Sequence, residues 1–365
     1  MAKVKKRIGE IDFYLLSTVL ILVAIGIVMV WSASSYVALH KNNNANYYLI
    51  KQLINVSIGL IGMIFAINVD YQKYKKLTIP IAIITFILLV VVLFSKPING
   101  ATRWINLGFT TIQPSEIAKY AVVLILAFSL EKAGEKIKKF TVLIFHLLIG
   151  GGFAFMVLLE KNMSIFSVMV IVTFIVVFID GAKFIHLFGL GISAFVGGIY
   201  LIFSADYRVK RLMSFTDPWV DPLGDGYQLI QSFYALGTGG LMGVGLGQSR
   251  QKAFYIPEPH NDFIFSIIGE ELGFIGCITI ILLFCFFIIR GIGIAFKAKD
   301  TYGTLIAVGF TSIIAIQAII NIAVVSGSMP VTGVPLPFIS YGGSAIAINL
   351  FAMGVLLNIS KQNSK

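Results

Sequence analysis

The sequence alternates between long apolar runs and short polar connections. As a helix, an apolar run of about 17–25 residues is long enough to cross the roughly 30 Å hydrocarbon core of a bilayer. Such runs occupy residues 13–34, 49–68, 77–95, 114–130, 140–159, 163–180, 184–204, 262–290, 303–325 and 341–359. The pattern predicts an all-α polytopic membrane protein of about ten transmembrane helices, with residues 1–365 forming a single integral membrane domain.

Two of these runs need interpretation. The fourth is the least regular, because Lys119 interrupts it. The first follows a basic N-terminus and looks like a secretory signal peptide. Its apolar stretch is too long for such a signal, and further spans follow it. We therefore interpret residues 13–34 as a signal anchor.

The basic residues of the short connections fall mostly on one side of the predicted membrane. They include the N-terminus, Lys73–Lys76, Lys132–Lys139, Arg290–Lys299 and Lys361–Lys365. Lys and Arg concentrate in cytoplasmic loops, so we expect this side, with both termini, to be cytoplasmic. The long connection between the seventh and eighth spans, residues 205–261, is then an external loop. Its aromatic residues could pack, and its length favours a functional role.

Composition supports the membrane assignment. Of the 365 residues, 58% are hydrophobic and only 12% are charged, and the mean hydropathy is +0.91. A soluble domain of this size carries about 25% charged residues. The net charge of +11 is concentrated in the predicted cytoplasmic connections, so we interpret it as a topology signal and expect no nucleic-acid partner.

The sequence also argues against a nucleotide-driven machine. The predicted cytoplasmic connections are too short for a nucleotide-binding domain, and the chain has no GxxxxGK[ST] motif. Several glycines between Gly237 and Gly247 resemble a phosphate-binding loop. They lie in the external loop without a strand before them, so close packing or a re-entrant turn is the favoured interpretation. A nest of backbone N–H groups for a lipid pyrophosphate stays open.

Polar residues at membrane depth are costly and are functional candidates for that reason. The first cluster combines Arg103 with the stretch QPSE (113–116) and Lys119. Glu116 and Lys119 are three residues apart and can pair along one helix face. One interpretation is a structural ion pair with a capped helix start. The other is a polar pocket in which Arg103 and Lys119 bind anionic head groups.

The second cluster closes the external loop and contains Glu258, His260 and Asp262. Asp262 could simply cap the eighth span, since Asp is a good N-cap residue. Alternatively, it tops a face of small residues on which helices can approach closely, formed by Ser266, Gly269, Gly273 and Gly276. A carboxylate shielded there from bulk water would have a raised pKa and could act as a general base.

Two further features have structural interpretations. Glu270 and Glu271 lie deeper in the eighth span, where we expect them to be paired or hydrogen-bonded inside the bundle. Residues 329–344 contain three prolines and a Gly pair, which block a helix. Free backbone groups are tolerated at this depth only where they are buried in protein or line a cavity. We interpret this third cluster, which includes Ser340, as wall and scaffold.

Together the three clusters resemble the SEDS family (shape, elongation, division and sporulation), which contains FtsW, RodA and SpoVE. The resemblance is carried by RWINLGFTTIQPSEIAK (103–119), by residues 227–274, which include FYIPEPHNDF, and by residues 317–345, which include VTGVPLPFISYGGSA. It extends over nearly the whole chain. The stretch GQSRQK (247–252) is more similar to the FtsW/SpoVE branch than to RodA.

The resemblance implies a peptidoglycan glycosyltransferase that polymerises lipid II at the outer face of the bacterial cytoplasmic membrane. Asp262 matches the family's key carboxylate and would be the catalytic general base. The substrate-binding residues would be Arg103, Gln113, Ser115, Glu116, Lys119, Glu258, His260 and Ser340. A divalent cation, Mg²⁺ or Mn²⁺, could neutralise the pyrophosphate, although no metal ligands can be named. No nucleotide cofactor is expected.

One position departs from the family pattern. Many relatives have a Pro-Asp-x-Gly-Thr-like stretch after the fifth span, where this chain has Glu160, Lys161, Asn162, Met163 and Ser164. If that Asp supplies a second carboxylate, Asn162 replaces it here, with Glu160 nearby. Catalysis by two carboxylates is thereby weakened, and Asp262 carries more of the reaction.

Two other functions stay open. A lipid II flippase would also have many spans, buried charges and broken helices, and a scaffold would only recruit division proteins. The resemblance implies three kinds of partner, namely lipid II with undecaprenyl-pyrophosphate-linked glycan, a class B penicillin-binding protein, and other divisome or sporulation membrane proteins. The sequence favours cell division or spore cortex synthesis over elongation.

Overall fold

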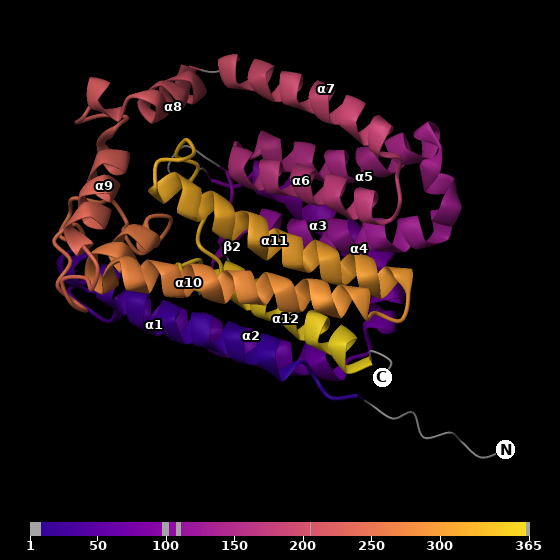
Figure 1. The fold of residues 1–365 in the computed structure, drawn as a ribbon, viewed down its shortest axis with the longest axis horizontal. Coiled ribbons are helices and arrows are strands. Elements are labelled where there is room, and N and C mark those ends of the chain that lie inside the picture. The colour runs from indigo at the N-terminus through magenta and orange to yellow at the C-terminus, as the bar shows by residue number, and fades with distance from the viewer. Residues whose placement is uncertain (1–8, 97–101, 107–110, 205, 363–365) are drawn as a thin grey trace.

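Long helices that run side by side dominate the computed structural model (Figure 1), which describes residues 9–96, 102–106, 111–204 and 206–362. The helices are α1 (Phe13–Asn42), α2 (Tyr47–Asn68), α3 (Tyr71–Leu93), α4 (Pro114–Ala133), α5 (Phe140–Leu159), α6 (Met163–Ile179), α7 (Phe184–Phe203), α8 (Asp206–Thr216), α9 (Tyr227–Gly239), α10 (Ile264–Phe296), α11 (Thr301–Val325) and α12 (Ser344–Gln362). Short 3₁₀ turns, η1 (Gly134–Lys138) and η2 (Pro218–Val220), and a two-stranded sheet, β1 (Ile105–Asn106) and β2 (Thr111–Ile112), complete the described elements.

The described helices confirm the all-α membrane architecture. Seven of them are long and apolar enough to cross a membrane, namely α1, α2, α3, α5, α10, α11 and α12. The helices α6 and α7 are shorter apolar helices. The remaining predicted span is α4, which carries Glu116, Lys119, Glu131 and Lys132. This arrangement agrees with the prediction of about ten transmembrane helices.

Several helices are longer than the apolar runs that predicted them. The first run ends at residue 34, whereas α1 continues to Asn42. The eighth run ends at residue 290, whereas α10 continues to Phe296. The apolar pattern reports only the part of a helix expected within the hydrocarbon core, whereas backbone hydrogen bonding can continue past its edge. The N-terminal basic residues used for the topology lie outside the described residues.

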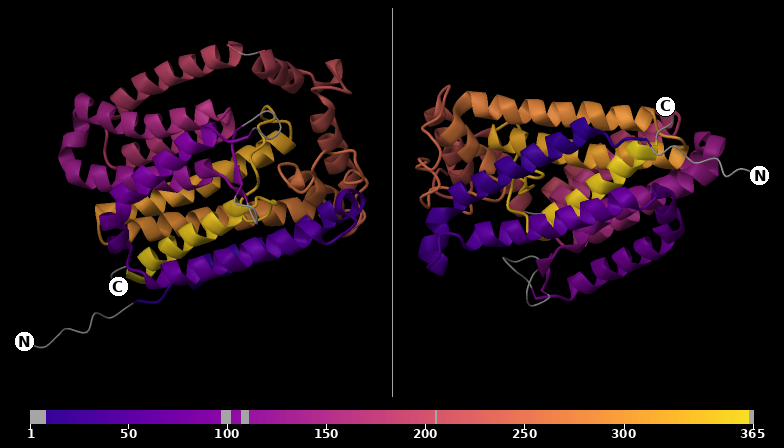
Figure 2. Two further views of the ribbon diagram at one scale, coloured as in Figure 1. Left: turned by 180° about the vertical axis from the view of Figure 1, so that it is seen from behind. Right: turned by 90° about the horizontal axis from the view of Figure 1, so that it is seen from below.

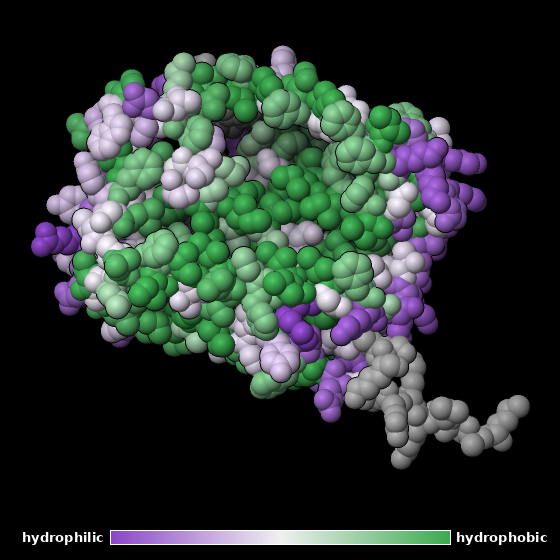
Figure 3. Space-filling view, viewed as in Figure 1, coloured by the Kyte–Doolittle hydropathy of each residue, from purple (hydrophilic) through white to green (hydrophobic). Residues whose placement is uncertain are grey.

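The bundle has two distinct ends. α1 begins and α12 ends at the same end, which we call the terminal end (Figures 1 and 2). The opposite end, the site end, carries α8, α9 and the start of α10. Between the ends, the surface in Figure 3 is a broad belt of hydrophobic residues, with hydrophilic residues gathered beyond it. Such a belt is what a bilayer requires of a spanning bundle.

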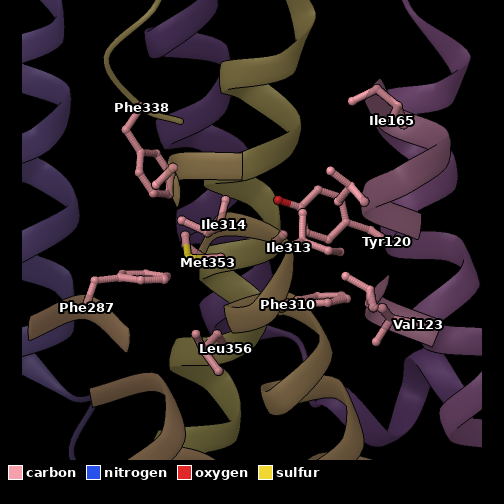
Figure 4. Close-up of a cluster of buried hydrophobic side chains, with 14 of the residues drawn as sticks. Tyr120, Val123, Ile165, Phe287, Phe310, Ile313, Ile314, Phe338, Met353 and Leu356 are labelled. Carbon is pink, nitrogen blue, oxygen red and sulfur yellow. The ribbon is translucent and has the colours of Figure 1, made fainter. Parts of the chain in front are cut away.

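Aromatic and aliphatic side chains from α4, α10, α11 and α12 fill the centre of the bundle (Figure 4). Tyr120 and Phe310 meet edge to face, with ring centroids 4.9 Å apart. The Tyr120 hydroxyl donates a 2.8 Å hydrogen bond to Asn349 Oδ1. Buried polar groups of this kind need a partner in an apolar surrounding, so the bond fixes α4 against α12.

Small residues allow the closest helix contacts. A Cβ atom placed on Gly354 of α12 would lie 2.4 Å from the carbonyl oxygen of Met63 in α2. A Cβ atom on Gly59 of α2 would lie 2.7 Å from the Leu350 side chain and 2.9 Å from Cα of Ala347 in α12. Close approach of this kind supplies much of the packing energy between membrane helices, where hydrophobic burial adds little.

The loop of residues 205–261, predicted to be external, folds back against α10 through the segment of residues 240–247, which follows α9. Val244 N–H donates to the carbonyl of Glu270, and Gly245 N–H donates to that of Glu271. In return, the N–H groups of Phe274 and Ile275 donate to Gly240 and Leu241. The segment therefore bonds to α10 through its backbone, which agrees with the close packing expected of these glycines.

This pairing depends on a break in α10. Gly273 has φ 67° and ψ −166°, which is not helical. The predicted small-residue face assumed one continuous helix, so it is wrong beyond Gly273. Before the break the face exists: Ser266 bonds to Ser232 of α9 at 2.8 Å, and Gly269 meets Leu236 of α9.

We expect Gly243→Ala to destabilise the fold more than Gly247→Ala. Both glycines have positive φ, 78° and 80°, which costs an L-residue about 1–2 kcal/mol. Only at Gly243 would the new Cβ meet backbone, 2.1 Å from the carbonyl oxygen of Glu271, which adds about 1–3 kcal/mol. Thermal unfolding in detergent measures both variants. Equal losses of stability would contradict the proposed backbone contact.

Candidate active site

A polar cavity of about 530 Å³ opens at the site end of the bundle. Its lining comes from segments that are far apart in the sequence. The residues are Arg103, Trp104, Thr111, Gln113, Glu116, Asn162, Ile165, Glu258, Asn261, Asp262, Gly333, Pro335, Tyr341, Gly342, Gly343, Ser344 and Ala345. The three polar clusters of the sequence thus meet around one space.

The β1–β2 pair and the start of α4 form one wall. Ile105 pairs with Ile112, which returns the chain to the cavity just before Pro114 starts α4. Proline suits this first helical position because its missing N–H would have no helical partner. Arg103 Nη2 donates a 2.5 Å hydrogen bond to the carbonyl of Lys161. This bond ties the wall to the turn between α5 and α6.

Glu116 and Lys119 form a buried ion pair behind this wall. Lys119 Nζ donates to Glu116 Oε2 at 2.7 Å and to Gln317 Oε1 of α11 at 2.9 Å. Both side chains are almost fully buried. Glu116 also lines the cavity, but Lys119 does not, because its ammonium group points into the bundle toward α11. The structure therefore favours the structural ion pair over direct head-group binding by Lys119.

Asp262 lies at the cavity, just before α10. The helix begins at Ile264 and its N-cap residue is Phe263. Asp262 therefore lies one residue before the N-cap position that the capping interpretation gave it. Asn321 of α11 holds the backbone here, because its Nδ2 donates 2.7 Å hydrogen bonds to the carbonyls of Asp262 and Val334. The carboxylate is left half-buried on the cavity lining.

Glu258 and His260 have different surroundings. Glu258 is exposed and lines the cavity, and it accepts a 2.7 Å hydrogen bond from Asn261 Nδ2. His260 is buried beneath the lining and packs against the rings of Tyr48 and Tyr341. Burial, with a smaller effect of Lys41, lowers the pKa of His260 to about 4. His260 is thus neutral near pH 7 and supports the wall.

The irregular segment before α12 forms the opposite wall, as its prolines predicted. Ser340 Oγ donates to the carbonyl of Asn261 at 2.7 Å and accepts from the N–H of Leu336 at 2.8 Å. Tyr341 N–H donates to the carbonyl of His260. Ser340 therefore joins the wall to the loop that carries Asp262 and does not line the cavity.

Glu160 and Asn162 occupy the turn between α5 and α6. Asn162 lines the cavity, and its Nδ2 lies 3.5 Å from Ser115 Oγ, which also accepts a 3.1 Å bond from Gln113. Glu160 is fully buried, and neither carboxylate oxygen has a hydrogen-bond partner among the described residues. Burial raises the pKa of Glu160 to about 8, against smaller opposite effects of Ser115 and Arg103.

A second buried network holds the external loop on α10. Lys252 Nζ donates to Glu271 Oε1 at 2.8 Å, and Ser32 Oγ of α1 donates to the same carboxylate. Glu270 accepts hydrogen bonds from the Ser249 hydroxyl and from the N–H of Arg250. The structural role expected of Glu270 and Glu271 is confirmed, whereas the pairing of Glu271 with Lys252 was not predicted.

Five of the nine predicted site residues line the cavity, and the other four support it. Those on the lining are Arg103, Gln113, Glu116, Glu258 and Asp262. Ser115, Lys119, His260 and Ser340 are buried around it. Sequence reasoning missed the contributions of Thr111, Asn261, Tyr341 and Ser344, although each lies within or beside a recognised motif. Their neutral side chains carry no charge signal at membrane depth.

The cavity combines acidic and basic groups in a way that suits acid–base chemistry. Asp262 and Glu258 can accept a proton, and Arg103 can face a developing negative charge. The described residues contain no group of three or more His, Cys, Asp or Glu side chains that could hold a metal by themselves. Carboxylate and amide oxygens nevertheless suit Mg²⁺ or Mn²⁺, which often use only one or two carboxylates together with substrate phosphates.

We expect Glu160→Gln to raise the thermal stability of the protein at pH 8.5 and to leave it nearly unchanged at pH 5. The pKa of Glu160, about 8, lies above that of an exposed glutamate. The folded state therefore keeps a proton that the unfolded state releases. The free energy of unfolding falls as pH rises from the pKa of an exposed glutamate to the pKa of Glu160. Glutamine removes this cost of up to a few kcal/mol.

The control for this experiment is Glu135→Gln, which removes an exposed carboxylate. Thermal unfolding in detergent should give parallel pH profiles for wild type and this control. A Glu160→Gln profile that is also parallel to wild type would show that Glu160 does not hold a proton.

Comparison with known proteins gives full-length similarity. The chain is 45% identical over 355 residues to stage V sporulation protein E of Bacillus subtilis (strain 168). The matched residues make up 96% of this chain and 97% of the relative. It is 42% identical over 359 residues to a probable peptidoglycan glycosyltransferase FtsW of Geobacter sp. (strain M18), with 97% and 98% covered.

Solved structures have the same fold. A chain of a peptidoglycan synthase complex that coordinates polymerization and crosslinking matches with a TM-score of 0.79 at 28% identity, covering 96% of this chain and 97% of that one. The rod shape determining protein RodA of Thermus thermophilus matches with a TM-score of 0.71 at 26% identity, covering 97% and 98%.

The sequence model of the FtsW/RodA/SpoVE family, described as "Cell cycle protein", matches residues 13–365. With its long apolar helices, the match identifies a multi-pass membrane protein and agrees with the resemblance noted in the three motifs. The chain belongs to the FtsW/RodA/SpoVE family.

Proposed function

We propose that this protein is a peptidoglycan glycosyltransferase that polymerises lipid II into glycan strands. The observation that carries the proposal is the single cavity in which Asp262, Glu258 and Arg103 meet. The names of its relatives support the same activity, because one is a probable peptidoglycan glycosyltransferase. A role in cell division or in spore cortex synthesis agrees with the likeness to FtsW and to stage V sporulation protein E.

In this proposal Asp262 is the general base. Its carboxylate takes the proton of the acceptor sugar's 4-hydroxyl as that oxygen attacks the anomeric carbon of the lipid-linked donor. The bond from that carbon to the pyrophosphate breaks, and its electron pair leaves with the pyrophosphate. Arg103 on the opposite wall lies where it can attract the charge that develops. The half-buried position of Asp262 keeps its charge from being fully screened by water.

A bound divalent cation would supply neutralisation of the pyrophosphate charge. Glu258 is the cavity carboxylate that could hold it, since Asp262 takes the proton and Glu116 is already paired with Lys119. Chain groups alone would leave it incompletely coordinated, and pyrophosphate oxygens fit the remaining positions.

The proposed location is the cytoplasmic membrane of a bacterium, with both termini in the cytoplasm and the site end outside. The distribution of Lys and Arg in the short connections supports this orientation. A class B penicillin-binding protein is the proposed partner, supported by the structural match to a chain of a complex that coordinates polymerization with crosslinking.

We expect Asp262→Asn to abolish polymerisation of lipid II by purified protein in liposomes. The substitution keeps the shape of the side chain but removes its basicity, and general-base catalysis contributes about 10²–10⁴-fold. The control Asp225→Asn alters an exposed carboxylate of the loop and should retain activity. Asp262→Asn activity within a few-fold of wild type would remove the general-base role. A wild type that moves labelled lipid II across the bilayer without elongating it would favour the flippase.

We also expect chelation to stop polymerisation, and Mg²⁺ or Mn²⁺ to restore it. The cation should protect the protein against thermal unfolding only when a pyrophosphate-bearing lipid is present, because the chain alone offers few ligands. Glu258→Gln should raise the Mg²⁺ concentration needed for half-maximal activity. Unchanged activity after exhaustive chelation would exclude the cation from the reaction.

A further inference from the structure

The segment of residues 240–247 exposes apolar side chains at a depth where lipid is expected. Leu241 is 70% exposed and Met242 is 77% exposed, and Val244 and Leu246 are also exposed. The chain carries no charged residue between Asp225 and Arg250. A patch of this kind on a water-facing loop would be unusual, because exposed apolar patches mark interaction surfaces.

The depth of the segment follows from its backbone bonds to α10. Residues 272–289 of α10 contain no charged side chain, and Arg290 follows them. At 1.5 Å per residue the helical part after Gly273, residues 274–289, spans about 24 Å, most of the thickness of the hydrocarbon core. Phe274 and Ile275, which bond to Gly240 and Leu241, therefore lie just inside the core at the site end.

The same surface continues from α10 onto the segment. Phe274 and Ile275 are themselves exposed apolar residues of the spanning part of α10, and we expect them to contact lipid. The backbone bonds place Leu241 and Met242 beside them. The N–H groups of Gly243, Val244 and Gly245 and the carbonyls of Gly240 and Leu241 have backbone partners. These groups meet the requirement that backbone groups in hydrocarbon be paired.

We propose that residues 240–247 enter the hydrocarbon region of the leaflet at the site end, and that this insertion fixes the height of the catalytic loop above the lipid head groups. The second part rests on the proposed function. The occupant of the surface is lipid acyl chain, because the segment is uncharged, lies at core depth and extends the lipid-facing surface of α10.

The link to the catalytic loop is rigid. Directly after the segment, Ser249 and Arg250 bond to Glu270, and Lys252 pairs with Glu271. The loop then turns toward Glu258 and Asp262. A change in the height of the segment would therefore move these carboxylates relative to a substrate whose pyrophosphate sits at the head-group level.

Site-specific fluorescence tests the insertion independently of activity. In full-length protein with Cys277→Ala and Cys285→Ala, which remove the free cysteines, Met242→Cys would carry a nitrobenzoxadiazole label. The matched control is Leu223→Cys, an exposed apolar position between Asp221 and Asp225. The labelled protein would be placed in vesicles of phosphatidylethanolamine and phosphatidylglycerol. The fluorescence quencher would be either a nitroxide on the lipid acyl chains or iodide in the surrounding water.

We expect the label at 242 to be quenched by the acyl-chain nitroxide and protected from iodide, and the label at 223 to behave in the opposite way. Iodide quenching at 242 equal to that at 223 would overturn the insertion. Protection at 242 from both quenchers would also overturn it, because a second copy of the chain would then cover the surface.

Activity tests the second part. The double variant Leu241→Ser/Met242→Ser should lose polymerisation several-fold in vesicles while keeping near wild-type activity in detergent, where no bilayer sets the height of the loop. Leu223→Ser should be active in both. Equal effects of the double variant in vesicles and detergent would overturn the positional role. An inactive wild type would instead contradict the proposed function and leave the quenching result standing.

Discussion

The rest of the structure depends on the pairing of charges that the fold removes from water. An uncompensated buried charge costs several kcal/mol, and removing one partner of a buried pair costs about 3–5 kcal/mol. The pair Glu116–Lys119 with Gln317 fixes α4 against α11. The pair Lys252–Glu271 with Ser32 fixes the external loop against α10 and α1. Each pair has a single arrangement that satisfies it, so the helices around the cavity are held in one geometry.

This constraint explains why the cavity has few mobile polar groups. Glu116 contributes a carboxylate to the lining, but its partner Lys119 remains inside the bundle. Ser340, His260 and Asn321 are committed to backbone and ring contacts. Asp262, Glu258 and Arg103 line the cavity. A site assembled this way is preorganised, because the supporting groups leave its walls little freedom to rearrange.

The sequence predicted the spanning helices well, because the apolar runs report directly on contact with lipid. It also indicated which clusters matter, since charge is rare at membrane depth. The sequence could not distinguish a residue on the cavity lining from one buried behind it. Arg103 and Lys119 are both basic residues at membrane depth, and the contact of Lys119 with Gln317 shows that Lys119 lies behind the lining. The break at Gly273 was equally invisible, because a glycine within an apolar run usually continues the helix.

That break has a consequence for how the chain can vary in length. Two carbonyls of α10 before Gly273 and two N–H groups after it bond to Val244, Gly245, Gly240 and Leu241. One residue inserted between Gly240 and Val244 would misalign every bond that follows, as a slip of register does in a sheet. The turn around residues 217–226 has no such match on α10, and its side chains are largely exposed. Length changes in the external loop should therefore accumulate in that turn.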